Sequence, residues 1–139
     1  FGFLPHIETL EARHRQSLQT DYARWVASLT APEDLILAMD DGIFVEHYGR
    51  RRTLGHPPMV RDAAALGDFF AEINGALKAG HRVFALESNF DYDRTEFFKK
   101  EFFRRYDVKM IGCKPNEDWH HFLLDRHVAD ECFMEVQRR

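Results

Sequence analysis

Apolar residues recur at helical spacing in three segments of the chain. Residues 6–29, 62–79 and 94–105 each carry them three or four positions apart, with polar residues between. This period is typical of helices that bury one face. We therefore expect an N-terminal amphipathic helix and two further helices.

Residues at the ends of these segments fit helix termini. Gly80 follows the second segment, where a left-handed residue commonly ends a helix. Asp93 precedes the third segment, and Glu96 stands three positions later, a spacing that predicts a capping box. The pair Ala31-Pro32 is expected to end the first helix.

Shorter apolar runs predict β-strands. The run 82–86 is almost continuously apolar, which favours a central strand covered on both faces. Asp-Gly stands between the runs 35–39 and 43–45, a strong hairpin signal, although one strand broken by a bulge also fits. The runs 121–124 and 132–136 predict a terminal antiparallel hairpin.

The order of these elements indicates an α/β fold. Residues 62–111 alternate helix, strand, helix and strand, so we expect parallel strands joined by a right-handed crossover. The prediction is a single α/β domain over 1–139. It has a mixed sheet of about five or six strands, an ordinary sheet size, with the N-terminal helix on one face. The first residue is Phe1, so we expect a processed chain or a piece of a longer protein.

Composition narrows the class of protein. The chain has 139 residues, 45% of them hydrophobic, and a net charge of -4, which is typical of one soluble globular domain. No apolar run approaches the roughly 20 residues that cross a bilayer, so we expect no membrane span. The slightly acidic balance disfavours a nucleic-acid partner. The 13 phenylalanines are expected to form the core.

Two cysteines, Cys113 and Cys132, stand in no recognisable motif. Residues 1–5 do not resemble a signal peptide. Both observations favour a reducing compartment, and we predict a cytoplasmic location. The spacing leaves open whether the two thiols come together.

The first candidate for chemistry is an acidic loop with Asp91, Asp93 and Thr95. It follows an apolar strand and opens a helix, where open α/β sheets bind ligands. The pattern Asp-x-Asp-x-Thr resembles the first motif of the haloacid dehalogenase-like phosphatases. The resemblance implies Mg²⁺ and an aspartate nucleophile. The plainer interpretation is a polar loop whose Asp93 caps the helix.

Two further groups of residues are candidates for a site. Arg50, Arg51 and Arg52 form a basic loop that could bind a small anionic ligand, or that is simply solvated. His120, His121, His127 and Cys132 lie close in sequence. Because adjacent residues of a strand face opposite ways, we predict no metal site there.

Residues 64–136 resemble one half of a phospholipase D-like domain. The likeness lies in a helix ending before the strand 82–86, the strand 107–111 and the segment 121–125. The family's pattern is His-x-Lys-x-x-x-x-Asp. Here no lysine stands two residues after His121, and Asp125 comes too early. The resemblance therefore implies a degenerate, non-catalytic member that uses these positions for binding.

These observations favour a non-catalytic α/β module for ligand sensing or protein–protein interaction. We expect a protein partner or a homo-oligomer, and no cofactor. The alternative hypothesis is a Mg²⁺-dependent phosphoric-ester hydrolase that uses the Asp91, Asp93 and Thr95 loop. A nucleic-acid-associated factor that uses Arg50 to Arg52 is a third, less favoured, hypothesis.

Overall fold

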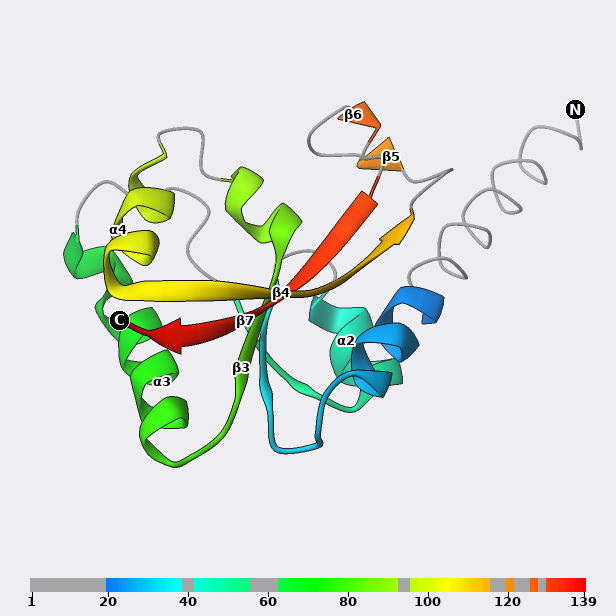
Figure 1. Ribbon diagram of the computed structural model, residues 1–139, viewed down its shortest axis with the longest axis horizontal. Helices are drawn as coiled ribbons and strands as arrows, with labels where there is room; N and C mark the ends of the chain where they lie inside the picture. Colours follow the sequence, from blue (N-terminus) through cyan, green and yellow to red (C-terminus); the bar gives the residue numbers. More distant parts are fainter. Residues whose placement is uncertain are drawn as a thin grey trace, which may run out of the picture.

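The computed structural model describes residues 20–38, 42–55, 63–92, 96–115, 120–121, 126–127 and 130–139. The main sheet has five strands in the order β2-β1-β3-β7-β4 (Figure 1). These are β1 Leu35–Leu37, β2 Arg52–Leu54, β3 Val83–Leu86, β4 Tyr106–Pro115 and β7 Asp130–Arg138. Two short strands, β5 His120–His121 and β6 Arg126–His127, pair separately.

Helices cover both faces of this sheet. They are α2 Gly42–Gly49, α3 Gly67–Lys78, α4 Phe97–Arg105 and the helical residues 20–28, with 3₁₀ turns η1 Ala63–Leu66 and η2 Glu87–Tyr92. Figure 1 shows α3 and α4 on one side, and α2 with residues 20–28 on the other. None of the helices in these ranges has the length and apolarity to cross a membrane.

The sheet mixes strand directions, as expected. Strand β1 runs parallel to β2 and β3, whereas β7 runs antiparallel to β3 and β4. This architecture confirms the predicted α/β domain with a mixed sheet. The second predicted helix is confirmed by η1 and α3, and Gly80 has the expected positive φ of 84°.

Strand β3 supplies side chains to both cores. Val83 and Ala85 are buried under α3 and α4, and Phe84 and Leu86 are buried under the other layer. Phe84 stacks on Phe133 of β7, with ring centroids 5.0 Å apart. Because neighbouring side chains of a strand face opposite ways, a continuous apolar run fits only a strand covered on both sides. The central position predicted for 82–86 is confirmed.

Phenylalanines dominate the core on the α3 and α4 side. Phe98 and Phe102 of α4 are fully buried, and Phe90 from η2 packs against both, at 5.9 and 5.0 Å between ring centroids. Phe69 of α3 meets Phe98 edge-on at 5.5 Å. Such aromatic pairs add to the stabilisation from burial itself. The expected structural role of these phenylalanines is confirmed.

A buried carboxylate ties the start of β1 to the start of β3. Asp34 accepts hydrogen bonds from the backbone N–H of Ala31 at 2.7 Å and of Arg82 at 3.3 Å. The N–H of Leu35 in turn donates to the carbonyl of Arg82 at 3.0 Å. The cost of burying the Asp34 carboxylate is offset by these donors.

The hairpin expected from the Asp-Gly pair is wrong. Gly42 begins helix α2, and the apolar residues 43–45 lie within it. Both sides of β1 are already paired with parallel strands, and a parallel neighbour requires a crossover connection, which α2 supplies. Within α2, Phe44 stacks on Tyr48 one turn later. The following residues, expected to be a loop, include the edge strand β2.

The capping box expected at 93–96 is also wrong. Helix α4 begins at Phe97, and Glu96 is its N-cap, in a left-handed conformation with φ 57° and no side-chain capping bond. Asp93 lies outside the described residues. Phe98 is buried in the core and Phe97 packs against it, so the helix begins where its apolar side chains meet the core and not at the predicted capping residue.

The C-terminal pairing differs from the expected hairpin. Strand β7 inserts between β3 and β4, so those two strands point the same way without being neighbours. Strand β7 therefore pairs with β3 and β4, and not with the run 121–124 as expected. His121 instead belongs to β5, which pairs with β6.

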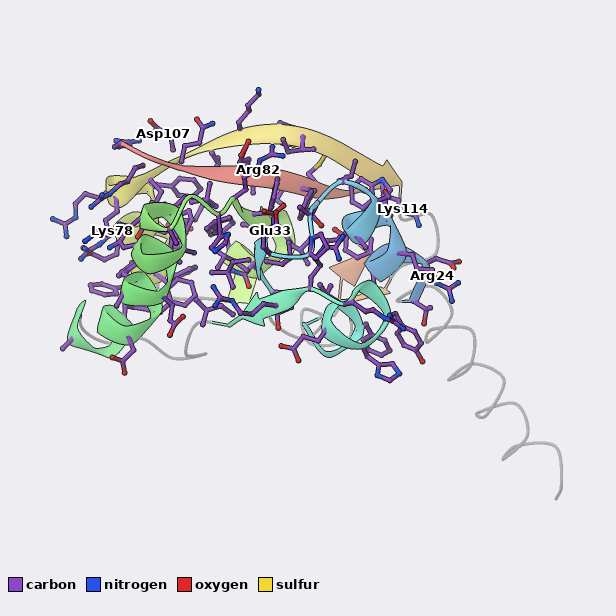
Figure 2. The ribbon with its side chains drawn as sticks, turned by 90° about the horizontal axis from the view of Figure 1, so that it is seen from below. Arg24, Glu33, Lys78, Arg82, Asp107 and Lys114 are labelled. Carbon is purple, nitrogen blue, oxygen red and sulfur yellow. A yellow bond between two sulfur atoms is a disulfide. The ribbon has the colours of Figure 1, made fainter. Side chains whose placement is uncertain are left out.

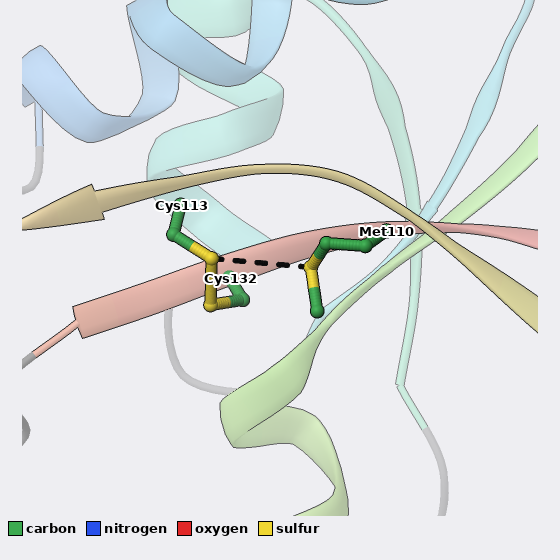
Figure 3. The surroundings of a disulfide bond; sticks show 3 residues. All are labelled: Met110, Cys113 and Cys132. Atoms are coloured by element: carbon green, nitrogen blue, oxygen red, sulfur yellow. Dashed lines mark hydrogen bonds between the residues drawn. A yellow bond between two sulfur atoms is a disulfide. The ribbon is translucent and has the colours of Figure 1, made fainter.

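A disulfide joins Cys113 of β4 to Cys132 of β7, directly across the ladder, with Cα atoms 4.0 Å apart (Figure 3). The sulfur of Met110 lies 3.9 Å from that of Cys113. Disulfides persist mainly in oxidising compartments. The cysteines therefore no longer support the expectation of a cytoplasmic location.

We expect the disulfide to stabilise the fold. It closes a loop with a sequence separation of 19, and the chain-entropy model gives about 3 kcal/mol for a loop of this size. Urea unfolding of the C113S/C132S variant should show a loss of this order. The oxidised wild type should lose the same amount on reduction. Equal stability of the oxidised and reduced wild type would contradict the prediction.

A surface ion pair should make stability depend on pH. The guanidinium of Arg82 bonds to Glu135 at 2.8 Å, which holds the pKa of Glu135 below its ordinary value against the opposing effect of burial. A lowered pKa stabilises the fold above the unfolded-state value and loses that contribution as pH falls through the folded-state value. E135Q should therefore flatten the acid side of the stability curve. An acid side as steep as that of the wild type would refute this.

Candidate binding groove

An open groove of about 630 Å³ runs between helix α3 and the edge strand β2. One wall comes from the outer side of α3 and the other from Arg52. The lining residues are Arg52, Asp68, Ala71, Glu72, Gly75, Ala76, Ala79 and His81. This volume lies in the usual range for ligand sites.

The sequence of α3 explains the shape of this groove. One face of the helix is apolar and buried against the sheet through Phe69, Phe70, Ile73 and Ala76. Beside that face, Ala71, Gly75 and Ala79 follow at intervals of four and lie in one row. Their small side chains leave space, and a Cβ at position 75 would meet nothing within 4 Å.

Charges of opposite sign lie at different points along the groove. Asp68 and Glu72 occupy the first half of α3, and His81 follows the end of the helix. Arg52 begins β2, and β2 runs parallel to β1, as does β3, which begins just after His81. Arg52 and His81 therefore lie toward the same end of the sheet. At 1.5 Å per residue, the helix from Asp68 to its end spans roughly 16 Å.

None of these four side chains makes a hydrogen bond or ion pair with another residue in the described ranges. By contrast, Arg82 and Arg139, also on the surface, are paired with Glu135 and Asp107. The polar groups of these four side chains are therefore available to a ligand in the groove.

The structure separates the three arginines proposed for anion binding. Arg52 lines the groove, and Arg50 is exposed with a left-handed φ of 53°. Arg51 turns inward. The run therefore does not present three free guanidinium groups to one ligand.

Arg51 holds the ends of two helices together. Its Nη2 donates to the carbonyls of Ala27 and Thr30, each at 2.9 Å, and its Nε donates to the hydroxyl of Thr30 at 2.9 Å. Its Nη1 donates to the carbonyls of Gly49 at 3.1 Å and Arg50 at 3.4 Å. Helix C-termini leave carbonyls without partners, and an arginine fork satisfies several at once. Arg51 thus has a structural role in the fold, and its predicted role in binding stays a prediction.

The other predicted site residues lie mostly beyond what the structure describes. Asp91 belongs to η2, directly after β3, as the sequence order requires. Asp93, Thr95 and Asp125 lie outside the described residues, and His121 is placed only as part of β5. The acidic-loop and phospholipase D-like hypotheses therefore stay predictions. Among the described residues, no three His, Cys, Asp or Glu side chains are grouped to hold a metal ion.

Sequence reasoning missed Asp68, Glu72 and His81. The signal available was the row of small residues beside the apolar stripe of α3, which marks where the helix surface is recessed. Arg52 was found, but as one member of a run and not as a residue of an edge strand.

We expect Arg51 to be needed for stability. R51A should lower the free energy of unfolding by about 2 kcal/mol, because several partly buried hydrogen bonds from a charged donor are lost. R51K keeps the charge without the fork geometry and should recover only part of the loss. The neighbouring R50A is the control, with an effect within about 0.5 kcal/mol. Thermal or urea unfolding measures all three, and equal effects of R51A and R50A would contradict the structural role.

Comparison of the chain with protein-family models, with curated proteins and with solved structures finds no match in any of the three. The function of the groove is therefore argued from its own geometry and chemistry.

Proposed function

We propose that the chain is a non-catalytic α/β binding module whose groove receives an extended peptide segment of a protein partner. The segment carries a cationic group at the Asp68 and Glu72 end and an anionic group at the Arg52 and His81 end. The observation that carries the proposal is this set of four unpaired polar side chains, with two carboxylates toward one end of the groove and the Arg52 guanidinium toward the other.

The dimensions of the groove suit an extended peptide. Its length of roughly 16 Å corresponds to about five residues of extended chain. The floor of Ala71, Gly75 and Ala79 admits a backbone close to the helix. Arg52 can bind a carboxylate through two parallel hydrogen bonds.

The chemistry of the groove suits recognition of a partner with charged groups. Its lining consists of two carboxylates, one guanidinium, one imidazole and small apolar groups. Such a set recognises charge and shape. The hydrolase hypothesis depends on Asp93 and Thr95, which lie outside the described residues.

A hexapeptide with lysine at one end, glutamate at the other and four alanines between them is the probe. Fluorescence anisotropy should show tighter binding of this peptide than of the same peptide with two lysines or with two glutamates. An exposed ion pair contributes about 0.2–1 kcal/mol, so R52E or E72K should each weaken binding by roughly two- to fivefold. The R52E/E72K exchange should restore part of the binding, because the peptide can enter in the opposite direction while Asp68 keeps its negative charge.

Position 75 provides a matched pair of variants. G75M fills the groove and should abolish binding, whereas G75A leaves the space and should keep it. Both replace a helical glycine and should raise stability by up to about 1 kcal/mol, so unfolding cannot explain a loss. Equal binding of the three peptides, or equal binding by G75M and G75A, would refute the proposal.

A further inference from the structure

Strand β4 forms the edge of the sheet opposite β2. It has ten residues, and in the described part of the chain it pairs only with β7. Figure 2 shows β4 as the outermost strand, with Asp107 near the end that follows α4 and Lys114 near the other end. An open edge of this length is a template for pairing with another strand.

Only the first half of β4 is regular. A bulge lies between Met110 and Gly112, and Arg105 ends helix α4 immediately before the strand. The segment Tyr106–Met110 is therefore the part that another strand can follow. Met110 is 54% exposed, an unusually large exposure for a large apolar side chain in the described part of the chain.

The hydrogen-bond pattern shows which backbone groups face outward. The N–H of Arg139 donates to the carbonyl of Arg105, so position 105 bonds toward β7. Antiparallel ladders alternate, so positions 107 and 109 also bond toward β7. The N–H and C=O groups of Tyr106, Val108 and Met110 then point to the open edge.

This edge is complementary to a second copy of itself. A two-fold axis at Val108 places Tyr106 opposite the partner's Met110 and Asp107 opposite the partner's Lys109. Asp107 and Lys109 are both exposed, and as residues two apart they share one face of the sheet. Directly opposed unlike charges stabilise a cross-strand pair.

Other positions of the axis fit less well. An axis at Asp107 or Lys109 sets like charges against each other and uses backbone groups that already bond to β7. An axis at Tyr106 runs into α4, and one at Met110 runs into the bulge. Val108 is the position that satisfies the backbone and the charges together.

The charges on this face already alternate across the strands. Arg82, just before β3, bonds to Glu135 of β7, and Glu135 stands opposite Lys109 of β4. The partner's Asp107 would continue the series of positive, negative, positive and negative. In the single chain, Arg139 forms an ion pair with Asp107 at 2.9 Å. Both side chains are exposed, so this ion pair is weak and leaves the Asp107 carboxylate able to change partner.

We propose that β4 pairs antiparallel with β4 of a second copy about a two-fold axis at Val108, joining two sheets into one. This surface is distinct from the groove, which lies at the β2 edge. The contact is short, with about six backbone hydrogen bonds, so the dimer should be weak and dependent on concentration.

Sedimentation velocity of the whole chain, from about 10 to about 500 µM, tests the dimer. The wild type should shift from monomer to dimer over this range. D107K and K109D each create like-charge contacts at both symmetry-related positions and should remain monomeric. An equal mixture of the two variants sets opposite charges against each other and should form a heterodimer, and the D107K/K109D exchange should form a homodimer.

Controls with the same change of net charge elsewhere are E33K and K78D, which should dimerise like the wild type. Circular dichroism checks that every variant is folded. A wild type that stays monomeric throughout would overturn the proposal. Dimerisation of D107K and K109D at the wild-type level would also overturn it, because the dimer would then use another surface. A mixture that behaves like its components would do the same.

Discussion

The fold depends on burying strand β3 on both of its faces. Its four residues alternate between two aromatic and aliphatic cores, while its backbone pairs with β1 on one side and β7 on the other. Helices are therefore required on both faces, which residues 20–28 with α2 and α3 with α4 provide. Because the centre of the sheet is apolar and covered on both faces, the charged side chains that could bind a partner lie at the two edges of the sheet.

The polar contacts at the start of β3 connect this core to the surface. Asp34 fixes the backbone of Arg82, and the side chain of Arg82 reaches over Phe84 to Glu135. The register of β1, β3 and β7 is thus reinforced by the buried Asp34 carboxylate and by the Arg82–Glu135 ion pair on the surface. That register also decides that Lys109 stands opposite Glu135, so the charge pattern at the β4 edge follows from the packing of the centre.

Two kinds of element were predicted correctly from the sequence: a helix whose apolar spacing continues over several turns, and a strand that is buried on both faces. Helix α3, with Gly80 after its end, is of the first kind, and strand β3 is of the second. The three apolar residues at 43–45 fit a strand as well as a helix turn, and only the pairing of β1 on both sides decides between them. The insertion of β7, the Cys113–Cys132 disulfide and the contact of Arg51 with Ala27 join positions 15 or more residues apart. No local pattern in the sequence encodes contacts at such separations. For the same reason, the sequence indicated Arg52 as a binding candidate but did not indicate the groove that this residue lines.

The two proposed surfaces have a joint consequence because they lie on opposite edges of one sheet. Pairing through β4 would leave β2 as the outermost strand at each end of a continuous sheet. With strands about 4.8 Å apart, the two grooves would be separated by roughly 40 Å across the strands. A single groove built from exposed charges binds weakly, but two grooves at a fixed separation favour a partner that carries two matching segments. Weak pairing of β4 would then be strengthened by the partner itself, since binding both segments holds the two copies together.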